Sequence, residues 1–215
     1  MLTVKQFTCN PFGENTYIVA DPENRECIII DCGALGNDEL SQIDQYITEQ
    51  QLNPIRLIAT HGHFDHNFGV GHIYEKYQLK VEIHQRDEQL LHTMVQQADS
   101  LAGIHLPLTE NIKAETFTDD FTFTLGGCNF SVIPTPGHTK GSVCFYSAEA
   151  QMLFSGDTLF KGTIGRTDLP YGSMFEMTNS LRRLCQLPDN TAIYPGHGPS
   201  TSLALELSSN PYLDR

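Results

Sequence analysis

Short β-branched runs broken by turn residues fill the first third of the chain, and such runs are typical of strands. Leu40, Ile43 and Ile47 repeat instead at the spacing of one helix face, which predicts an amphipathic helix ending before Asn53-Pro54. The first half therefore mixes strands with helices. We expect strands at Leu2–Thr8, Thr16–Ala20, Cys27–Asp31, Ile55–Ala59 and Lys80–His84, and helices at 38–50, 69–77 and 86–101.

The second half is richer in strands, which Gly or charged turns join as in a meander. The predicted fold class is α/β with helices on both faces, and strand-rich stretches in both halves permit two facing sheets. Since one α/β unit can absorb 215 residues, we expect a single domain over residues 1–215. The remaining predicted strands are Thr116–Thr124, Cys128–Ile133, Ser142–Ser147, Met152–Phe154 and Ala192–Tyr194, and the remaining helices are 173–185 and 203–207.

The chain is acidic, with 26 Asp and Glu against 13 Lys and Arg and a formal net charge of −13. Polyanions bind surfaces rich in Lys and Arg, so this balance argues against nucleic acid or an anionic membrane as a partner. No window approaches 18 consecutive apolar residues and no signal-peptide pattern opens the sequence, so we expect a cytoplasmic protein. Six scattered cysteines without a C-x-x-C pair predict buried, reduced thiols.

Four short polar motifs each follow an apolar run that is predicted to be a strand. The loops at the carboxyl ends of strands are where α/β proteins build their sites. The first motif contains His61, His63, Asp65 and His66, a pattern expected by chance about once in a thousand chains of this composition. On an extended backbone His61 and His63 point the same way and can share one metal ion, while Asp65 and His66 follow a turn and can face a second position.

The other three motifs contribute one possible metal ligand each. His138 and His197 each lie in a Pro-Gly-His turn, where glycine lets the backbone approach a ligand closely. Asp157 follows an apolar strand, where a bridging position between two cations would compensate the cost of burying its charge. Five His, two Asp and no Cys suit zinc or a similar metal at an open catalytic centre that keeps a water molecule. No such role is expected for the other histidines, His72, His84, His92 and His105.

The segment 85–113 has two interpretations. Its apolar positions fit an amphipathic helix and loop that pack on the core, which is the interpretation we favour. The same segment can also be a lid over the site.

In their order and spacing these residues resemble the metallo-β-lactamase superfamily, from about Phe7 to Gly198. The resemblance implies an αββα four-layer sandwich of two mixed β-sheets flanked by helices, with the site at one edge of the sheets. Gly156-Asp-Thr-Leu-Phe and Asn15-x-Tyr17 are similar to glyoxalase II, the hydroxyacylglutathione hydrolase. Only 18 residues follow His197, so we expect the helical domain that gives glyoxalase II much of its glutathione pocket to be missing. The chain looks most like short, single-domain bacterial glyoxalase II-like proteins.

The resemblance also implies a role for each residue of the motifs. Two divalent metal ions are expected, zinc first, although iron or manganese accepts the same side chains. Asp31 would support the ligand loop, unless it only caps a turn, and Arg166 would contact an anionic part of the substrate or form a surface salt bridge. One ion would be held by His61, His63 and His138 and the other by Asp65, His66 and His197, with Asp157 bridging the two.

The implied reaction is hydrolysis of an S-2-hydroxyacylglutathione, such as S-lactoylglutathione, or of a related small thioester. A water shared by two cations would have its pKa lowered from about 15.7 toward about 7 and would attack the carbonyl, while Asp65 holds or relays the proton. A mononuclear iron persulfide dioxygenase using His61, His138 and Asp157 stays open as the alternative. A metal-binding module without catalysis is less favoured. The sequence decides neither the metal nor the oligomeric state.

Overall fold

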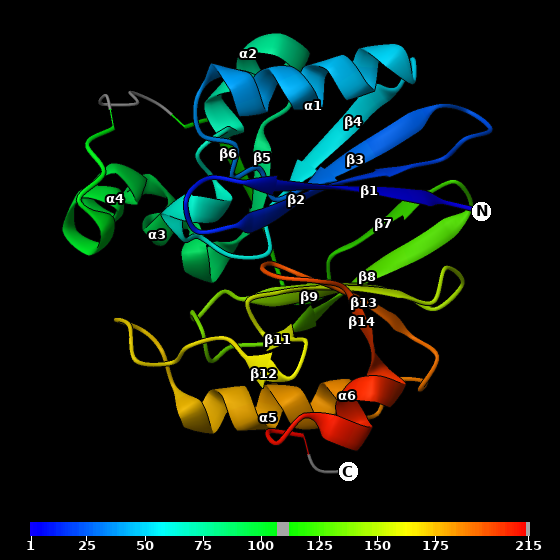
Figure 1. Ribbon diagram of the computed structural model, residues 1–215, viewed down its shortest axis with the longest axis vertical. Coiled ribbons are helices and arrows are strands. Elements are labelled where there is room, and N and C mark those ends of the chain that lie inside the picture. The colour runs from blue at the N-terminus through cyan, green and yellow to red at the C-terminus, as the bar shows by residue number, and fades with distance from the viewer. Residues whose placement is uncertain (107–111, 214–215) are drawn as a thin grey trace.

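The computed structural model describes residues 1–106 and 112–213 and arranges them in four layers (Figure 1). Two six-stranded sheets face each other in the middle. Helices α1 (Asn37–Glu49) and α2 (Val70–Tyr77) lie outside the first sheet, and α5 (Met174–Leu184) and α6 (Leu203–Ser209) lie outside the second. The αββα sandwich implied by the resemblance is therefore confirmed.

The first sheet is mixed and has the strand order β1-β2-β3-β4-β5-β6. Its first three strands pair antiparallel, and β3 to β6 pair parallel. Because side chains alternate along a strand, Ile28 and Ile30 face the second sheet while Ile29 packs on the helix side. The strands are β1 (Thr3–Cys9), β2 (Glu14–Ala20), β3 (Glu26–Ile30), β4 (Asn53–Ile58), β5 (Val81–His84) and β6 (Ala114–Phe117).

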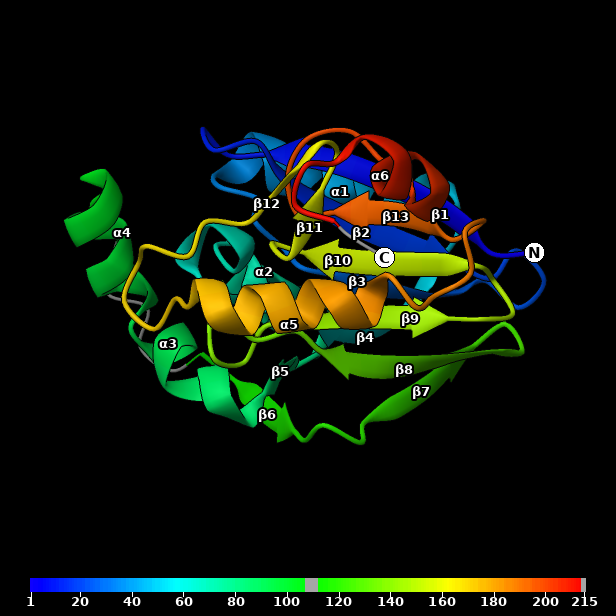
Figure 2. The same ribbon diagram turned by 90° about the horizontal axis from the view of Figure 1, so that it is seen from below.

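The second sheet is also mixed and has the strand order β14-β13-β10-β9-β8-β7. The strands β7 to β10 pair antiparallel in sequence order, which is the predicted meander, and β13 pairs parallel with β10. Figure 2 shows α5 and α6 lying across the outer face of this sheet. The strands are β7 (Thr122–Leu125), β8 (Cys128–Pro134), β9 (Val143–Ser147), β10 (Met152–Gly156), β13 (Ala192–Pro195) and β14 (Thr201–Ser202), and β11 (Leu159–Phe160) pairs with β12 (Thr163–Ile164) in a separate ribbon.

Apolar side chains fill all three spaces between the layers. Phe130, Phe145 and Phe154 are fully buried between the two sheets. Ile43 of α1 packs on the outer face of the first sheet, and Met177 of α5 packs on the second. Since burying one such side chain stabilises the folded state by about 1.5–3 kcal/mol, these layers hold the strand ends firmly in place.

The predicted strand Thr116–Thr124 is wrong as a single element. Residues up to Phe117 belong to β6 of the first sheet, and residues from Thr122 belong to β7 of the second. The chain crosses between the sheets at Asp119 and Asp120, whose exposed carboxylates favour a turn. Phe117 and Phe123 both point into the space between the sheets, so apolar side chains on either side of the crossing belong to one core cluster.

The predicted helix 86–101 is also divided. A 3₁₀ turn, η2 (Gln85–Asp87), leads into α3 (Glu88–His92) and α4 (Met94–Ala102). The break falls at Thr93, whose hydroxyl donates to the carbonyl oxygen of Leu90 at 2.8 Å and so competes with the helical hydrogen bonds. Met94 and Ala98 of α4 pack on Phe64, while Leu101 stays exposed. Residues 107–111 of the possible lid lie outside the described residues.

Five of the six cysteines are buried and Cys128 is half-buried, all as free thiols. Burial raises the pKa of Cys9 and of Cys27 to about 12, so both are protonated at neutral pH. The prediction of buried, reduced thiols therefore holds for all but Cys128, whose burial is partial.

No helix within the described ranges is long and apolar enough to cross a membrane.

Candidate metal centre

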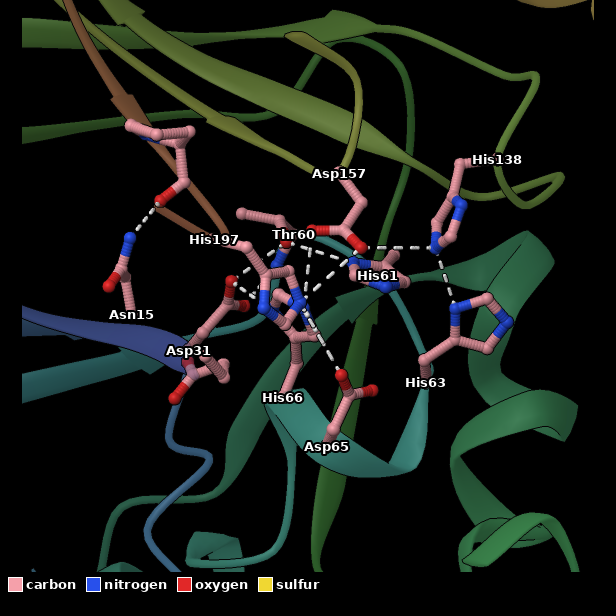
Figure 3. A network of polar contacts seen from close by, with 12 residues as sticks. Asn15, Asp31, Thr60, His61, His63, Asp65, His66, His138, Asp157 and His197 are labelled. Carbon is pink, nitrogen blue, oxygen red and sulfur yellow. Dashed lines mark hydrogen bonds and ion pairs between the residues drawn. The ribbon is translucent and has the colours of Figure 1, made fainter. Parts of the chain in front are cut away.

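The loops that follow five strands meet at one edge of the sandwich (Figure 3). The loop after β4 carries two histidines and continues into the short 3₁₀ turn η1 (Phe64–His66). The loops after β3, β8, β10 and β13 each add one side chain. The structure thus brings together Asp31 and all seven predicted ligands. The ligands are His61, His63, Asp65, His66, His138, Asp157 and His197.

Three buried imidazoles form the first group of donors. The ligand atoms of His61, His63 and His138 all lie within 4.8 Å of one another. Nδ1 of His63 is 2.7 Å from Nε2 of His138. Two aromatic nitrogens at this distance need either a shared proton or a cation between their lone pairs, so the group suits a bound metal ion.

The second group lies beside the first and is more acidic. Asp65, His66 and His197 have ligand atoms within 4.8 Å of one another. Asp157 stands between the two groups: its Oδ1 is 3.3 Å from Nε2 of His66, and its Oδ2 is 3.4 Å from Nε2 of His138. One carboxylate therefore faces both groups, which is the position expected of a bridging ligand.

Several of the imidazoles are oriented by a hydrogen bond through the ring nitrogen that faces away from the cluster. Asp31 contacts Nδ1 of His66 at 2.9 Å, and the carbonyl oxygen of Phe12 contacts Nδ1 of His197 at 3.1 Å. The carbonyl oxygen of Arg166 lies 2.8 Å from Nδ1 of His138. Such contacts fix the tautomer and direct the other nitrogen, Nε2, toward a common centre, as metal-binding histidines require.

Two polar atoms at the centre lack a hydrogen-bond partner. Nε2 of His61 and Oδ1 of Asp157 are buried and make no hydrogen bond. A buried polar atom without a partner costs about 1–3 kcal/mol, so this pair indicates a missing ligand. The backbone also leaves room for one, because a Cβ at Gly196 would lie only 2.3 Å from Oδ1 of Asp157. The residues present therefore fit divalent metal ions.

The charges at the centre also favour cations. Burial and the neighbouring His138 lower the pKa of His63 to about 3, so this imidazole is neutral and its lone pair is free at neutral pH. Burial would also lower the pKa of His66, but the carboxylates of Asp157, Asp31 and Asp65 raise it well above its usual range. The pocket around His66 thus favours positive charge, which a metal ion would supply.

Asp31 is hydrogen-bonded to the ligand loop that follows β4. It accepts hydrogen bonds from the backbone N–H of Thr60 at 2.7 Å and from the Thr60 hydroxyl at 2.8 Å, in addition to its contact with His66. Its φ of +57° places it in the left-handed region, where Asp is tolerated better than most residues. The carboxylate therefore links the end of β3 to the loop after β4.

Two buried carboxylates near the centre were not predicted from the sequence. Glu14 is fully buried, forms a group with Asp31 and His66, and accepts a hydrogen bond from the Thr16 hydroxyl at 2.9 Å. Burial raises its pKa well above the usual range, although His66 opposes this. Its signal in the sequence was a lone acidic residue two positions before the apolar strand 16–20.

Asp87 is the second unpredicted carboxylate. It accepts the backbone N–H of Gly62 at 2.9 Å, the backbone N–H of Gly141 at 2.6 Å and the hydroxyl of Thr139 at 2.6 Å. These partners lie in the ligand loops after β4 and β8, one from each sheet. An acidic residue at the predicted start of a helix is typical of a cap, which hid this role in the sequence.

The centre opens into a cavity of about 550 Å³ lined mainly by apolar side chains such as Phe12, Phe160 and Ile164. Arg166 lies on its rim, and its exposed guanidinium pairs with Asp168 at 2.8 Å. Both predicted contacts of this side chain, with a substrate and with a surface acid, are thus available to it. The hydrogen bond from His138 to the Arg166 carbonyl was not predicted, since a backbone contact leaves no trace in residue type.

The other four histidines do not join the centre. His72, His84 and His105 each contact an aspartate elsewhere in the fold, at 2.7–2.8 Å. Neither they nor His92 belong to the groups of possible metal ligands among the described residues.

The family model of the metallo-beta-lactamase superfamily matches residues 9–197. The chain belongs to this superfamily. Its relatives include the probable metallo-hydrolase YqgX of Bacillus subtilis, 32% identical over 98% of this chain and 97% of that protein. The hydroxyacylglutathione hydrolase GloC of Haemophilus influenzae is 36% identical over 94% of each chain.

Solved structures of the superfamily agree with this fold. BLEG-1, a B3 metallo-beta-lactamase, has a TM-score of 0.88 at 30% identity and covers 98% of this chain and 99% of its own. TTHA1623 in a di-iron-bound form has a TM-score of 0.85 at 34% identity and covers 97% and 100%. The metallo-β-lactamase fold binds metal ions, and the cluster of His and Asp in this chain lies at the end of the sandwich where its ligand loops converge.

Proposed function

We propose that this member of the superfamily is a metal-dependent hydrolase of small thioesters, with S-2-hydroxyacylglutathiones such as S-lactoylglutathione as candidate substrates. The observation that carries the proposal is the convergence of seven nitrogen and carboxylate donors beside an open cavity, with Nε2 of His61 and Oδ1 of Asp157 lacking hydrogen-bond partners. The name of the GloC relative supports the thioester part of the proposal.

The proposed metal centre follows the two groups of donors. One ion is assigned to the three imidazoles of the first group, and the other to Asp65, His66 and His197, with Asp157 between them. When bound, the two ions lower the pKa of a coordinated water and polarise the thioester carbonyl. Zinc is the metal we propose, although the di-iron form of TTHA1623 makes iron the first alternative to measure.

The chain's own side chains supply the rest of the chemistry. Asp65 is only 15% exposed, lines the cavity and contacts Nε2 of His197 at 3.4 Å, so its carboxylate can accept and pass on a proton. Burial would raise the pKa of Asp65, but His66 and His197 lower it, which keeps the carboxylate ionised. The apolar cavity wall excludes water around the reacting carbonyl, where charged groups act more strongly. The guanidinium of Arg166 is offered to an anionic part of the substrate.

The proposal also covers where the protein acts and on what. We propose a cytoplasmic enzyme whose partner is a small molecule, because the net charge of −13 opposes binding of a polyanion. A groove that binds a nucleic acid would be lined by several Lys and Arg side chains. Among the residues that line this cavity, Arg166 alone is a Lys or Arg.

The experiment combines metal analysis with a substrate panel. The purified protein is analysed for Zn, Fe and Mn by mass spectrometry, stripped with a chelator and reloaded with each metal. We expect two ions per chain and hydrolysis of S-lactoylglutathione or another small thioester that is lost on stripping and restored by reloading.

The same panel contains the rival reactions. Consumption of oxygen with a persulfide by iron-loaded protein, together with no thioester hydrolysis by the two-metal form, would favour the dioxygenase. Hydrolysis of a β-lactam but of no thioester would assign the activity named for BLEG-1. Tight metal binding without any turnover would leave the non-catalytic module.

A further inference from the structure

A groove of about 210 Å³ continues from the cavity of the metal centre toward α4. The two spaces share His63, Leu101 and Leu169 as lining residues, so a molecule in the cavity can extend into the groove without leaving the surface. One wall is α4 with α3, and the other is the turn formed by residues 169–172. A substrate that is bound at the metal centre and has one long end would therefore place that end in this groove.

The turn that closes the groove contains a residue in an unusual conformation. The N–H of Gly172 donates to the carbonyl oxygen of Leu169 at 2.9 Å, and Pro170 and Tyr171 are the two central residues. Proline in the first central position and a positive φ in the second define a type II turn, which favours glycine in the second position. Tyr171 occupies it with a φ of +74° and is the single aromatic residue with positive φ in the described part of the chain.

The Tyr171 side chain lies outside the hydrophobic core clusters of the described residues. Its side chain is 64% exposed, and it lines the groove beside Leu101, which is 48% exposed. A large side chain in the left-handed region is strained, and such strain persists mostly at functional positions. The exposed ring and Leu101 together offer an apolar clamp across the mouth of the groove.

The helical wall of the groove indicates which chemical groups the groove would hold. It presents the neutral polar side chains of Thr93, Gln96, Gln97 and Ser100, and no Asp, Glu, Lys or Arg lines the groove. Gln97 is buried, and its Nε2 donates to the carbonyl oxygen of Leu90, but its Oε1 has no hydrogen-bond partner. A buried acceptor without a hydrogen-bond partner favours a ligand that donates an N–H to it.

We infer that the groove is a subsite for the thiol arm of the substrate, and that Tyr171 and Gln97 determine specificity for an amide-bearing stretch of that arm that carries no charge where it lies in the groove. This inference rests on the proposed thioester hydrolysis. A short acyl group stays at the metal centre, so the thiol part is the end long enough to reach the groove. Its amide N–H would donate to Oε1 of Gln97, while its chain lies between the ring of Tyr171 and Leu101.

The test compares thioesters with one acyl group and three thiols. Ethanethiol gives a short arm, N-acetylcysteamine gives an arm with one amide, and 2-acetoxyethanethiol gives an arm of equal length with an ester in its place. We expect kcat/KM to be about tenfold higher for the amide arm than for the other two, through KM rather than kcat. Calorimetric binding of the matching uncleavable thioethers should give the same order.

Variants of the turn separate specificity from folding. Tyr171→Gly suits the turn and is expected to keep the melting temperature, to raise KM about tenfold for the amide arm and to leave the ethyl thioester unchanged. Tyr171→Phe should behave as the parent, because the ring carries the effect. In Gln97→Met the preference for amide over ester should disappear.

The possible failures are distinguishable. If no thioester is hydrolysed, the proposed function is wrong. If thioesters are hydrolysed with the same KM for all three arms, and Tyr171→Gly changes none of them, the proposed function stands and the subsite is wrong.

Discussion

The metal centre forms the floor of the site and is built differently from the rim of the cavity and groove. In the floor, His61 and Asp31 are at most a few per cent exposed, and hydrogen bonds at strand ends fix them. On the rim, Arg166 of the cavity and Tyr171 of the groove are more than half exposed. Changes in the floor should therefore alter the chemistry, whereas changes in the rim should alter only which molecule is accepted.

The difference follows from the cost of burial. A buried polar group must be paired, so each floor residue depends on the others and few substitutions are tolerated. An exposed side chain stays hydrated in the folded protein, so its replacement changes the free energy of unfolding little. Matched variants of floor and rim residues would test this difference in tolerance to substitution.

The largest effect is expected for Asp157→Asn. The substitution keeps the shape of the side chain but removes the charge between the two groups of imidazoles, so we expect loss of metal and a fall in kcat/KM on the order of 10³. Metal content and thioester hydrolysis measure the two effects. Asp168→Asn, which removes an exposed carboxylate nearby, is the control and should retain both; a fully metallated, active Asp157→Asn protein would refute the role of the floor.

A smaller effect is expected for Asp31→Asn. The carboxylate touches His66 and Thr60 but is outside both groups to which we assign the ions, and loss of such an orienting partner costs about 10–100-fold in metal affinity or activity. Metal affinity is measured by competition with a chelator. Asp38→Asn, at an exposed position of α1, should leave the affinity unchanged. An equal affinity in both variants would mean that Asp31 only shapes a turn.

The smallest effect is expected on the rim, for Arg166→Ala. The guanidinium is 59% exposed and already paired with Asp168, so we expect kcat/KM to change less than about threefold. The measurement uses one thioester with an anionic thiol part and one with a neutral thiol part. A rise in KM confined to the anionic substrate, and larger than tenfold, would support the proposed substrate contact and move Arg166 to the functional side of the comparison.

The sequence predicted the floor better than the rim. Each ligand motif directly follows a strand, so local pattern alone placed His61, His138 and His197 at one edge of the sheets. Asp87 escaped prediction because its three partners lie 25, 52 and 54 positions away in the chain. The strain at Tyr171 escaped as well, since a dihedral angle is not encoded by residue type.

The elements show the same limit. Strands and helices with strong periodicity were found, whereas the crossing at Asp119 and the break at Thr93 were missed. At both places the backbone changes direction within a run that was predicted to be one element. The crossing depends on the sheet with which each half pairs, and the break depends on the Thr93 hydroxyl, neither of which apolar spacing reveals.

The three hydrogen bonds to Asp87 hold the loops after β4 and β8 together without help from any ion. An ion that enters a site already shaped by folding does not have to order the chain, and it binds the folded state only. At a free concentration about 100 times its dissociation constant, such an ion would add about 2.7 kcal/mol to the free energy of unfolding. The amount of folded protein in a cell would then rise and fall with the metal supply, and the enzyme's abundance would itself report on that supply.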